Sequence, residues 1–338
     1  MQISCLKSAK VYKELFMDKV SRRKFLKDTG ISTVALGLVT ASGKAEEVIQ
    51  GFEDTKTEID PGKTWHKEYD RKIRVGIAGY GVCRFGAAFG FQDHPNVEVA
   101  AVTDLIPARC QELAKACRCK KTCYHDDLYA MRELYKAGEF GKIIYSEGEY
   151  YHYMATPLDS YKGWRIGLPP QYYPTHSNAY YCGVTGGSFT RVACLGMPSI
   201  CGHLTPSGNA YKNAFGTEIA LFKTSEGGMS RMAVSWDTPG DSGEKGRIRG
   251  QKGSFYGTFE GQQRVVIPKK PPLPPTVSAG VHGGSHGYLT NEFIMSILEN
   301  RKPLVDVTMA LNMSVSGVVA HQSALKDGET LEIPQFVM

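Results

Sequence analysis

Residues 72–81 read KIRVGIAGYG, and this stretch decides the fold of the first part of the chain. Its first seven residues alternate apolar and other side chains and are rich in β-branched types, which predicts a buried strand. The strand runs into Gly79 and Gly81, and residues 82–91 then predict a helix. Gly79 permits a tight turn, and Gly81 lets the backbone approach a pyrophosphate at the N-terminus of that helix.

A second strand is expected over residues 97–103, and it ends at Asp104. Pro107 then opens a helix that runs to about residue 118, because proline is favoured in a first turn. At the end of the second strand a carboxylate can accept hydrogen bonds from ribose hydroxyls and would repel a 2′-phosphate, which favours NAD over NADP. The expected cofactor contacts are Gly79, Tyr80, Gly81, Val82, Cys83, Arg84 and Asp104.

The third glycine of a G-x-G-x-x-G pattern is missing, since Arg84 stands in its place. A purely structural glycine turn is therefore the alternative to nucleotide binding. The position of the turn between a strand and a helix, with an acid after the second strand, favours nucleotide binding.

After Gly141 the pattern changes to strands in succession followed by helices. A Ser-Glu-Gly-Gly turn at residues 225–228 predicts a hairpin between two of these strands. Asp306 is a plausible N-cap for a last helix, which Gly328 would stop. Strands are expected at residues 142–153, 188–196, 218–224, 229–236, 246–250 and 254–258, a proline-rich crossing at 268–275, and helices at 126–138, 288–299 and 306–326. The fold class expected for the whole chain is α/β plus α+β, since segregated strands and helices are typical of the latter.

The N-terminus has the order of an export signal. Residues 21–27 read SRRKFLK, a modest apolar stretch follows over 31–41, and small residues end it. The Arg22-Arg23 pair resembles the twin-arginine type, which predicts a periplasmic or otherwise extracytoplasmic protein exported by that machinery. The alternative is an amphipathic helix with a chance arginine pair. We assign residues 1–45 to the signal and 46–70 to a linker, with Met17 as a second candidate start.

The net charge of +6 does not indicate nucleic-acid binding. Residues 1–45 carry nine Lys or Arg and three Asp or Glu, so the rest of the chain is neutral. No apolar run reaches the roughly 20 residues of a membrane helix. The nine cysteines lack the paired spacing of a zinc site, so we expect no metal; packing on one helical face is expected for those near Cys110.

Several stretches together resemble the glucose–fructose oxidoreductase/inositol dehydrogenase/MocA family over about residues 70–335. These are residues 74–81, 94–104, 137–143, 173–177, 250–254 and 301–306. The resemblance implies a Rossmann domain followed by an open-sheet α+β domain, and hydride transfer between nicotinamide and a hydroxyl carbon of a sugar or cyclitol. It also implies association into a homo-oligomer through the exposed face of the sheet.

Site residues follow from the same resemblance. His176 matches the active-site histidine, although the acid four residues earlier is replaced by Tyr172. An imidazole suits removal of a hydroxyl proton near neutral pH, and a structural hydrogen-bonding histidine is the alternative. The candidates to line a polyol pocket are Trp164, Arg165, Tyr172, Tyr173 and His286.

The first domain is too short for the family. About 70 residues separate Lys72 from the strand near Lys142, whereas six strand–helix units need about 150. We therefore expect a partial Rossmann domain over 71–140 and an α+β substrate and oligomerisation domain over 141–338. The Glu-Lys-Pro motif that carries a catalytic lysine in relatives does not occur. A deletion in the gene, a deletion in the sequence record and a diverged short form all remain open.

Three functions remain in view. The first is an exported NAD-dependent oxidoreductase. The second is an NAD-using glycosidase of the same family. The third is a non-catalytic remnant that binds carbohydrate or forms oligomers. Binding of dinucleotide separates the first two from the third.

Overall fold

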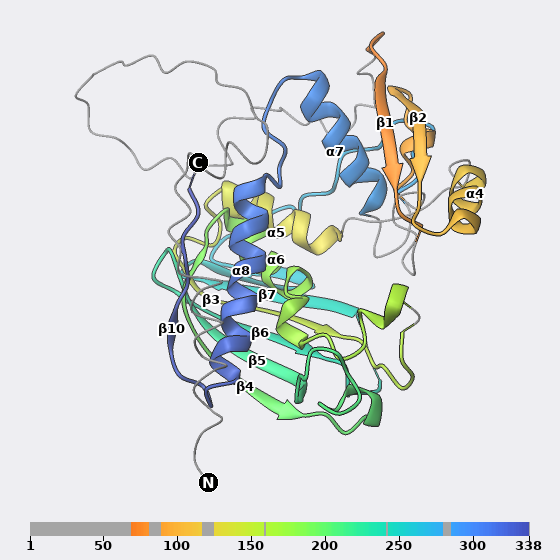
Figure 1. The fold of residues 1–338 in the computed structure, drawn as a ribbon. Coiled ribbons are helices and arrows are strands. Elements are labelled where there is room, and N and C mark those ends of the chain that lie inside the picture. The colour runs from red at the N-terminus through yellow and green to blue at the C-terminus, as the bar shows by residue number, and fades with distance from the viewer. Residues whose placement is uncertain are drawn as a thin grey trace, which may run out of the picture. The chain divides into compact units, whose positions relative to one another are not determined.

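The computed structural model describes residues 69–80, 89–116, 125–158, 160–240, 243–279 and 285–337. These residues form two sheets, one of two strands and one of eight, with helices packed against each (Figure 1). Short 3-10 turns also occur at Phe91–Asp93, Tyr161–Gly163, Pro170–Tyr172 and Gly202–Leu204.

The smaller sheet pairs β1 (Ile73–Ala78) and β2 (Val97–Thr103) in parallel. Among the described residues of 71–140 these are the only strands. Their parallel pairing means that both carboxyl ends, at Ala78 and Thr103, meet at one edge of the sheet. Both strands were expected from the sequence at nearly these bounds.

One face of this sheet is apolar and is covered by two helices. Helix α4 (Pro107–Ala116) places the fully buried Leu113 against Ile77 and Tyr80. Helix α7 (His286–Leu298) places Ile294 against Ile73 and Val97 at the other end of the strands. The residues of the opposite face are exposed: Arg74, Gly76, Ala78, Glu98, Ala101 and Thr103. A helix remote in sequence therefore completes the layer on the covered face.

The larger sheet has the strand order β10-β4-β5-β6-β3-β7-β8-β9. All neighbours pair antiparallel except β3 and β6, which are parallel. The strands are β3 (Ile143–Tyr151), β4 (Phe189–Pro198), β5 (Phe215–Thr224), β6 (Met229–Ser235), β7 (Gly243–Gly250), β8 (Gly253–Tyr256), β9 (Thr258–Gly261) and β10 (Leu331–Glu332). The predicted hairpin joins β5 and β6, with Gly227 at φ +81 in its turn. The predicted strand at 254–258 is instead split between β8 and β9.

Three helices cover one face of the larger sheet: α5 (Asp126–Lys136), α6 (Thr175–Thr185) and α8 (Val307–Ala324) (Figure 1). Their apolar side chains and those of the strands form one continuous core, which includes Met131, Tyr181 and Phe222. Asp306 caps α8, since its Oδ1 accepts a hydrogen bond of 2.9 Å from the backbone N–H of Met309. This cap was predicted from the sequence.

Helix α6 was not predicted. Its sequence, THSNAYYCGVT, is poor in strong helix formers. Tertiary packing holds it: Asn178 Nδ2 donates 2.9 Å hydrogen bonds to Met313 O and Ser316 Oγ of α8. Gly148 of β3 lets the helix approach, because a Cβ there would lie 2.2 Å from Ser177 O. The helix therefore forms where the sheet and its neighbours place it.

No helix among the described residues is both long and apolar enough to cross a membrane. The predicted signal, residues 1–45, lies outside the described residues, as does most of the linker, 46–70.

Candidate functional site

A pocket of about 400 Å³ lies at the carboxyl ends of β1 and β2. Gly79 turns the chain there with φ +95, a conformation that favours glycine, and its N–H donates 2.8 Å to Thr103 O. The lining residues are Ala78, Gly79, Thr103, Asp104, Leu105, Ile106 and Arg109. Ligands of open α/β sheets bind at this end of the strands.

The Asp104 carboxylate links the glycine turn after β1 to the segment after β2. Its two oxygens accept hydrogen bonds from the backbone N–H groups of Ile106 (2.8 Å) and Tyr80 (2.5 Å). These two bonds, in that order, and the positive charge of Arg109 hold the pKa of Asp104 below its usual value. The group is thus ionised at neutral pH. Each oxygen keeps a further acceptor site, so hydroxyl groups can still bind to it.

Of the predicted cofactor contacts, the structure brings Gly79, Tyr80 and Asp104 together. The other four, Gly81, Val82, Cys83 and Arg84, lie outside the described residues. Arg109 was not predicted; it comes from α4 and lines the pocket beside Asp104. Cys110 follows it, half-buried, with Sγ 3.8 Å from Val102 O.

A second cluster surrounds His176, the second residue of α6. Its ring packs against two tyrosines, with centroid distances of 4.5 Å to Tyr150 and 4.6 Å to Tyr173, and these two rings lie 5.6 Å from each other. Tyr150 comes from β3, and its hydroxyl pairs with His152 Nδ1 at 2.9 Å. Burial, followed by the positive charge of Arg165, lowers the pKa of His152. His152 is therefore neutral at physiological pH.

Arg165 and Trp164 border this cluster. The Arg165 guanidinium lies 5.2 Å from the ring centre of Tyr173 and 5.6 Å from that of Trp164. Arg165 is 8% exposed and Trp164 is 51% exposed, so the tryptophan presents an aromatic face to solvent. In sugar-binding sites, an aromatic face packs against the C–H groups of the sugar and a guanidinium donates hydrogen bonds to its hydroxyls.

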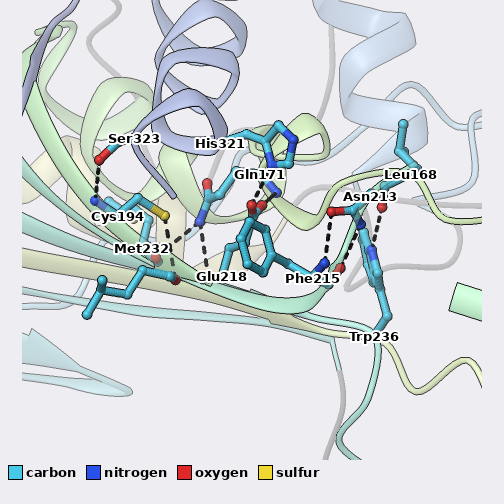
Figure 2. A network of polar contacts seen from close by, with 11 residues as sticks. Leu168, Gln171, Cys194, Asn213, Phe215, Glu218, Met232, Trp236, His321 and Ser323 are labelled. Carbon is cyan, nitrogen blue, oxygen red and sulfur yellow. Dashed lines mark hydrogen bonds and ion pairs between the residues drawn. The ribbon is translucent and has the colours of Figure 1, made fainter. Parts of the chain in front are cut away.

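Trp236 forms the buried base of the cluster. Its ring lies 6.0 Å from both Tyr150 and Tyr173, and its Nε1 donates 2.8 Å to Leu168 O (Figure 2). Met154, Leu204 and Val234 pack around it. The tyrosines that flank His176 thus stand on a rigid apolar base.

A carboxylate from another part of the chain holds His176. Glu244, on β7, places Oε1 2.6 Å from Nδ1 of His176 and Oε2 2.6 Å from Nε2 of His125. Burial alone would raise the pKa of Glu244, but the hydrogen bonds and charges of His125 and His176 outweigh it and hold that pKa well below its usual value. Glu244 is therefore an anion at any pH near neutrality.

The structure places the predicted site residues in more than one environment. Trp164, Arg165, Tyr173 and His176 form one cluster. Tyr172 instead packs edge-on against His321 at 5.0 Å. His286 is buried at the start of α7, with its ring 4.2 Å from Phe89.

Sequence reasoning missed Glu244, His125, Tyr150 and Trp236. Glu244 lies 68 residues after His176, and no local motif marks it. It arrives because β7 pairs with β3 so that Glu244 stands opposite Tyr150. Glu244 could have been identified only from the pairing of β7 with β3, together with the presence of an acidic residue at the start of β7.

No family model matches the chain, and no curated protein matches its sequence. Solved structures match its fold. A levoglucosan dehydrogenase in complex with NADH and levoglucosan has a TM-score of 0.57 at 13% identity, covering 79% of this chain and 100% of its own. The WlbA dehydrogenase from Bordetella pertussis, in complex with NADH and UDP-GlcNAcA, has a TM-score of 0.57 at 14% identity, with 80% and 100% covered.

A myo-inositol dehydrogenase from Lactobacillus casei, in complex with NAD(H) and myo-inositol, is also similar, with a TM-score of 0.53 at 12% identity and 79% and 98% of the chains covered. These three proteins are dehydrogenases. The chain has their fold: a Rossmann-like unit followed by an open-sheet α+β unit. The fold class expected from the sequence is confirmed.

Proposed function

We propose that the chain is an exported NAD-dependent oxidoreductase that transfers a hydride between nicotinamide and a hydroxyl carbon of a sugar or cyclitol. The observation that carries the proposal is the pocket at the carboxyl ends of β1 and β2, where the Gly79 turn faces the Asp104 carboxylate. The fold shared with dehydrogenases that bind NADH supports it.

The residues of this pocket fit the adenosine half of the cofactor. None of the residues that the structure describes lies within 4 Å of where a Cβ of Gly79 would stand, so on their side a phosphate can approach the backbone. Asp104 offers acceptor sites to ribose hydroxyls and repels a 2′-phosphate, which is the basis for proposing NAD rather than NADP. NAD held by these residues would supply the acceptor for the hydride that leaves the hydroxyl carbon.

The cluster around His176 would bind and orient the polyol. Trp164 and Tyr173 would pack on its C–H groups, and Arg165 would donate to its hydroxyls. His176 would take the proton of the reacting hydroxyl at Nε2, because its Nδ1 faces Glu244. The O–H and C–H bonds of the substrate would break and a carbonyl would form. The proton would go to His176 and the hydride to the nicotinamide.

Binding of NAD tests this function directly. Titration calorimetry and thermal unfolding of the mature chain should show saturable NAD binding and a rise in melting temperature of several degrees. A weaker response to NADP is expected. Absence of both signals with intact protein would reject the oxidoreductase and the NAD-using glycosidase together.

A carbohydrate-binding domain is the second candidate, because one specific observation favours it. The aromatic and arginine cluster lies entirely in residues 150–244, so it does not need the dinucleotide pocket. Binding of cyclitols or sugar acids without NAD binding would support this candidate. The mutation Trp164→Ala should then weaken binding, since it removes an exposed aromatic face.

We propose export through the twin-arginine route on the basis of Arg22 and Arg23. Replacing both with lysine should retain the protein in the cytoplasm, and fractionation of cells that express the tagged full chain measures this. Efficient export of the double variant would reject the assignment.

We propose self-association through the face of the large sheet on which no helix of the described residues packs. Its exposed apolar side chains are Leu195, Met197, Ile219, Leu221 and Met229. Exposed apolar patches of this kind mark interaction surfaces. Light scattering should show an oligomer that Leu221→Lys dissociates; a monomeric wild type would reject the proposal.

A further inference from the structure

Two histidines share the Glu244 carboxylate, one on each oxygen. His176 Nδ1 lies 2.6 Å from Oε1, and His125 Nε2 lies 2.6 Å from Oε2. The three residues come from α6, β7 and the N-cap of α5. The position where the sequence led us to expect an acid for His176 is Tyr172, whose ring packs on His321 instead.

We propose that Glu244 is the positioning residue of His176, and that it fixes the imidazole with a proton on Nδ1 and an accepting lone pair on Nε2. This inference rests on the proposed function, in which His176 Nε2 receives the hydroxyl proton. It assigns the supporting carboxylate to a strand 68 residues later in the chain.

The tautomer follows from the chemistry of the carboxylate. An ionised carboxylate has no hydrogen to donate, so each nitrogen that faces it must donate. His176 therefore carries its hydrogen on Nδ1, and in the neutral ring Nε2 has a free lone pair. A carboxylate at Nδ1 also holds the imidazole in one tautomer and one orientation.

The orientation of the ring is fixed from three sides. The Tyr150 ring is tilted by 30° to it and the Tyr173 ring by 46°, and both pack against neighbouring sides of the imidazole. Glu244 prevents rotation about the remaining axis. Because His125 occupies Oε2, the carboxylate cannot turn away from His176 without losing a hydrogen bond. His125 thus helps to position His176 indirectly, through Glu244.

The accepting nitrogen faces outward from this frame. His176 is 26% exposed at its side chain, whereas Glu244 is 10% exposed. No hydrogen bond from another described residue to His176 Nε2 occurs, and that nitrogen is not among the buried unpaired atoms. A substrate hydroxyl can therefore reach Nε2 while water is largely kept from Glu244.

The test compares Glu244→Gln with Glu149→Gln in the full chain. Glu149 lies on β3 and points to the opposite face of the sheet, where it pairs with Arg231 at 3.7 Å, so it is a matched control. Nitrogen-15 NMR of labelled histidines should show His176 as a single Nδ1–H tautomer in the wild type and in Glu149→Gln. Glu244→Gln should lose this signature, because an amide can present its NH₂ group to Nδ1.

Steady-state kinetics with a sugar or cyclitol that the protein oxidises give a second readout. Glu244→Gln should lower kcat about 100- to 10,000-fold and leave KM nearly unchanged, since the residue does not touch substrate. A structural role alone would raise KM and lower stability without changing the tautomer. His125→Gln should have the same effect in weaker form, and it serves as the second variant if Glu244→Gln does not fold.

The two failures are distinguishable. If NAD does not bind but the Nδ1–H signature depends on Glu244, the oxidoreductase proposal fails and the positioning role stands. If NAD binds but His176 carries its proton on Nε2, or Glu244→Gln leaves tautomer and kcat unchanged, the positioning role is overturned.

Discussion

Glu218 Oε1 lies 2.5 Å from Nδ1 of His321, and this contact is sealed between the large sheet and α8 (Figure 2). The Glu218 side chain is fully buried and that of His321 is 6% exposed. The other Glu218 oxygen accepts a 2.7 Å hydrogen bond from the backbone N–H of Gln171. A single buried carboxylate thus ties β5 to α8 and to the segment that leads into α6.

Breaking this contact should cost stability. Glu218→Gln removes the charge and replaces one accepting oxygen by an NH₂ group, so either His321 Nδ1 or the Gln171 N–H loses its acceptor, which typically costs about 1–3 kcal/mol. Chemical denaturation measures the loss. The control is Arg191→Gln, because Arg191 pairs with Glu332 at 2.8 Å on an exposed edge and should contribute under about 1 kcal/mol. If the two variants lose the same free energy of unfolding, the burial of Glu218 does not make its contacts more stabilising than an exposed ion pair.

Gly148 should be intolerant of a side chain. A Cβ at this position would meet Ser177 O at 2.2 Å and Ser177 C at 2.9 Å, so Gly148→Ala must push α6 off the sheet. Such overpacking costs about 1–3 kcal/mol and would displace His176, the neighbour of Ser177. The free energy of unfolding, measured by chemical denaturation, and the NAD-linked activity should both fall.

The matched control for that substitution is Gly76→Ala. Gly76 is also a strand glycine, but no atom of the described part of the chain lies within 4 Å of its Cβ position. Its replacement should leave stability unchanged or raise it slightly, because alanine loses less backbone entropy on folding. If Gly148→Ala is as harmless as Gly76→Ala, the close approach of α6 does not constrain the site.

Asp104 should set cofactor affinity and choice. Asp104→Ala removes the acceptor for ribose hydroxyls and frees the N–H groups of Tyr80 and Ile106, so NAD affinity should fall about 10- to 100-fold. Preference should shift toward NADP, because the repulsion of a 2′-phosphate is lost while Arg109 stays. Calorimetry with both cofactors measures this. Glu98→Gln, on the exposed face of β2, is the control and should bind NAD normally.

The sequence predicted what local patterns determine. The strand before Gly79, the acid that ends the second strand and the cap at Asp306 all depend on residues within one element, and the structure has each of them. The hairpin between β5 and β6 was likewise readable from its Gly-Gly turn. These features need no information about distant contacts.

The sequence did not predict what the strand pairing brings together. Helix α6 has weak intrinsic helix propensity and is held by Asn178 and by the space at Gly148. Glu244 and His125 reach His176 from positions 68 and 51 residues away, so no spacing rule could join them. Tyr172 was a candidate to line the polyol pocket because aromatic faces pack on sugar C–H groups, and in the structure its ring packs edge-on against His321.

Acid should weaken the fold through Glu244. Its pKa is lowered in the folded chain, so the unfolded chain binds the proton more readily. The stabilisation is then fully present above the ordinary carboxyl value of 4.5 and is lost as the pH falls toward the lower folded value. Glu244→Gln has no such proton to bind. The difference in unfolding free energy between wild type and variant should therefore narrow by about 1–3 kcal/mol between pH 6 and pH 3. Urea denaturation across this range measures it, and a constant or widening gap would contradict the assignment of an ionised Glu244 held by two histidines.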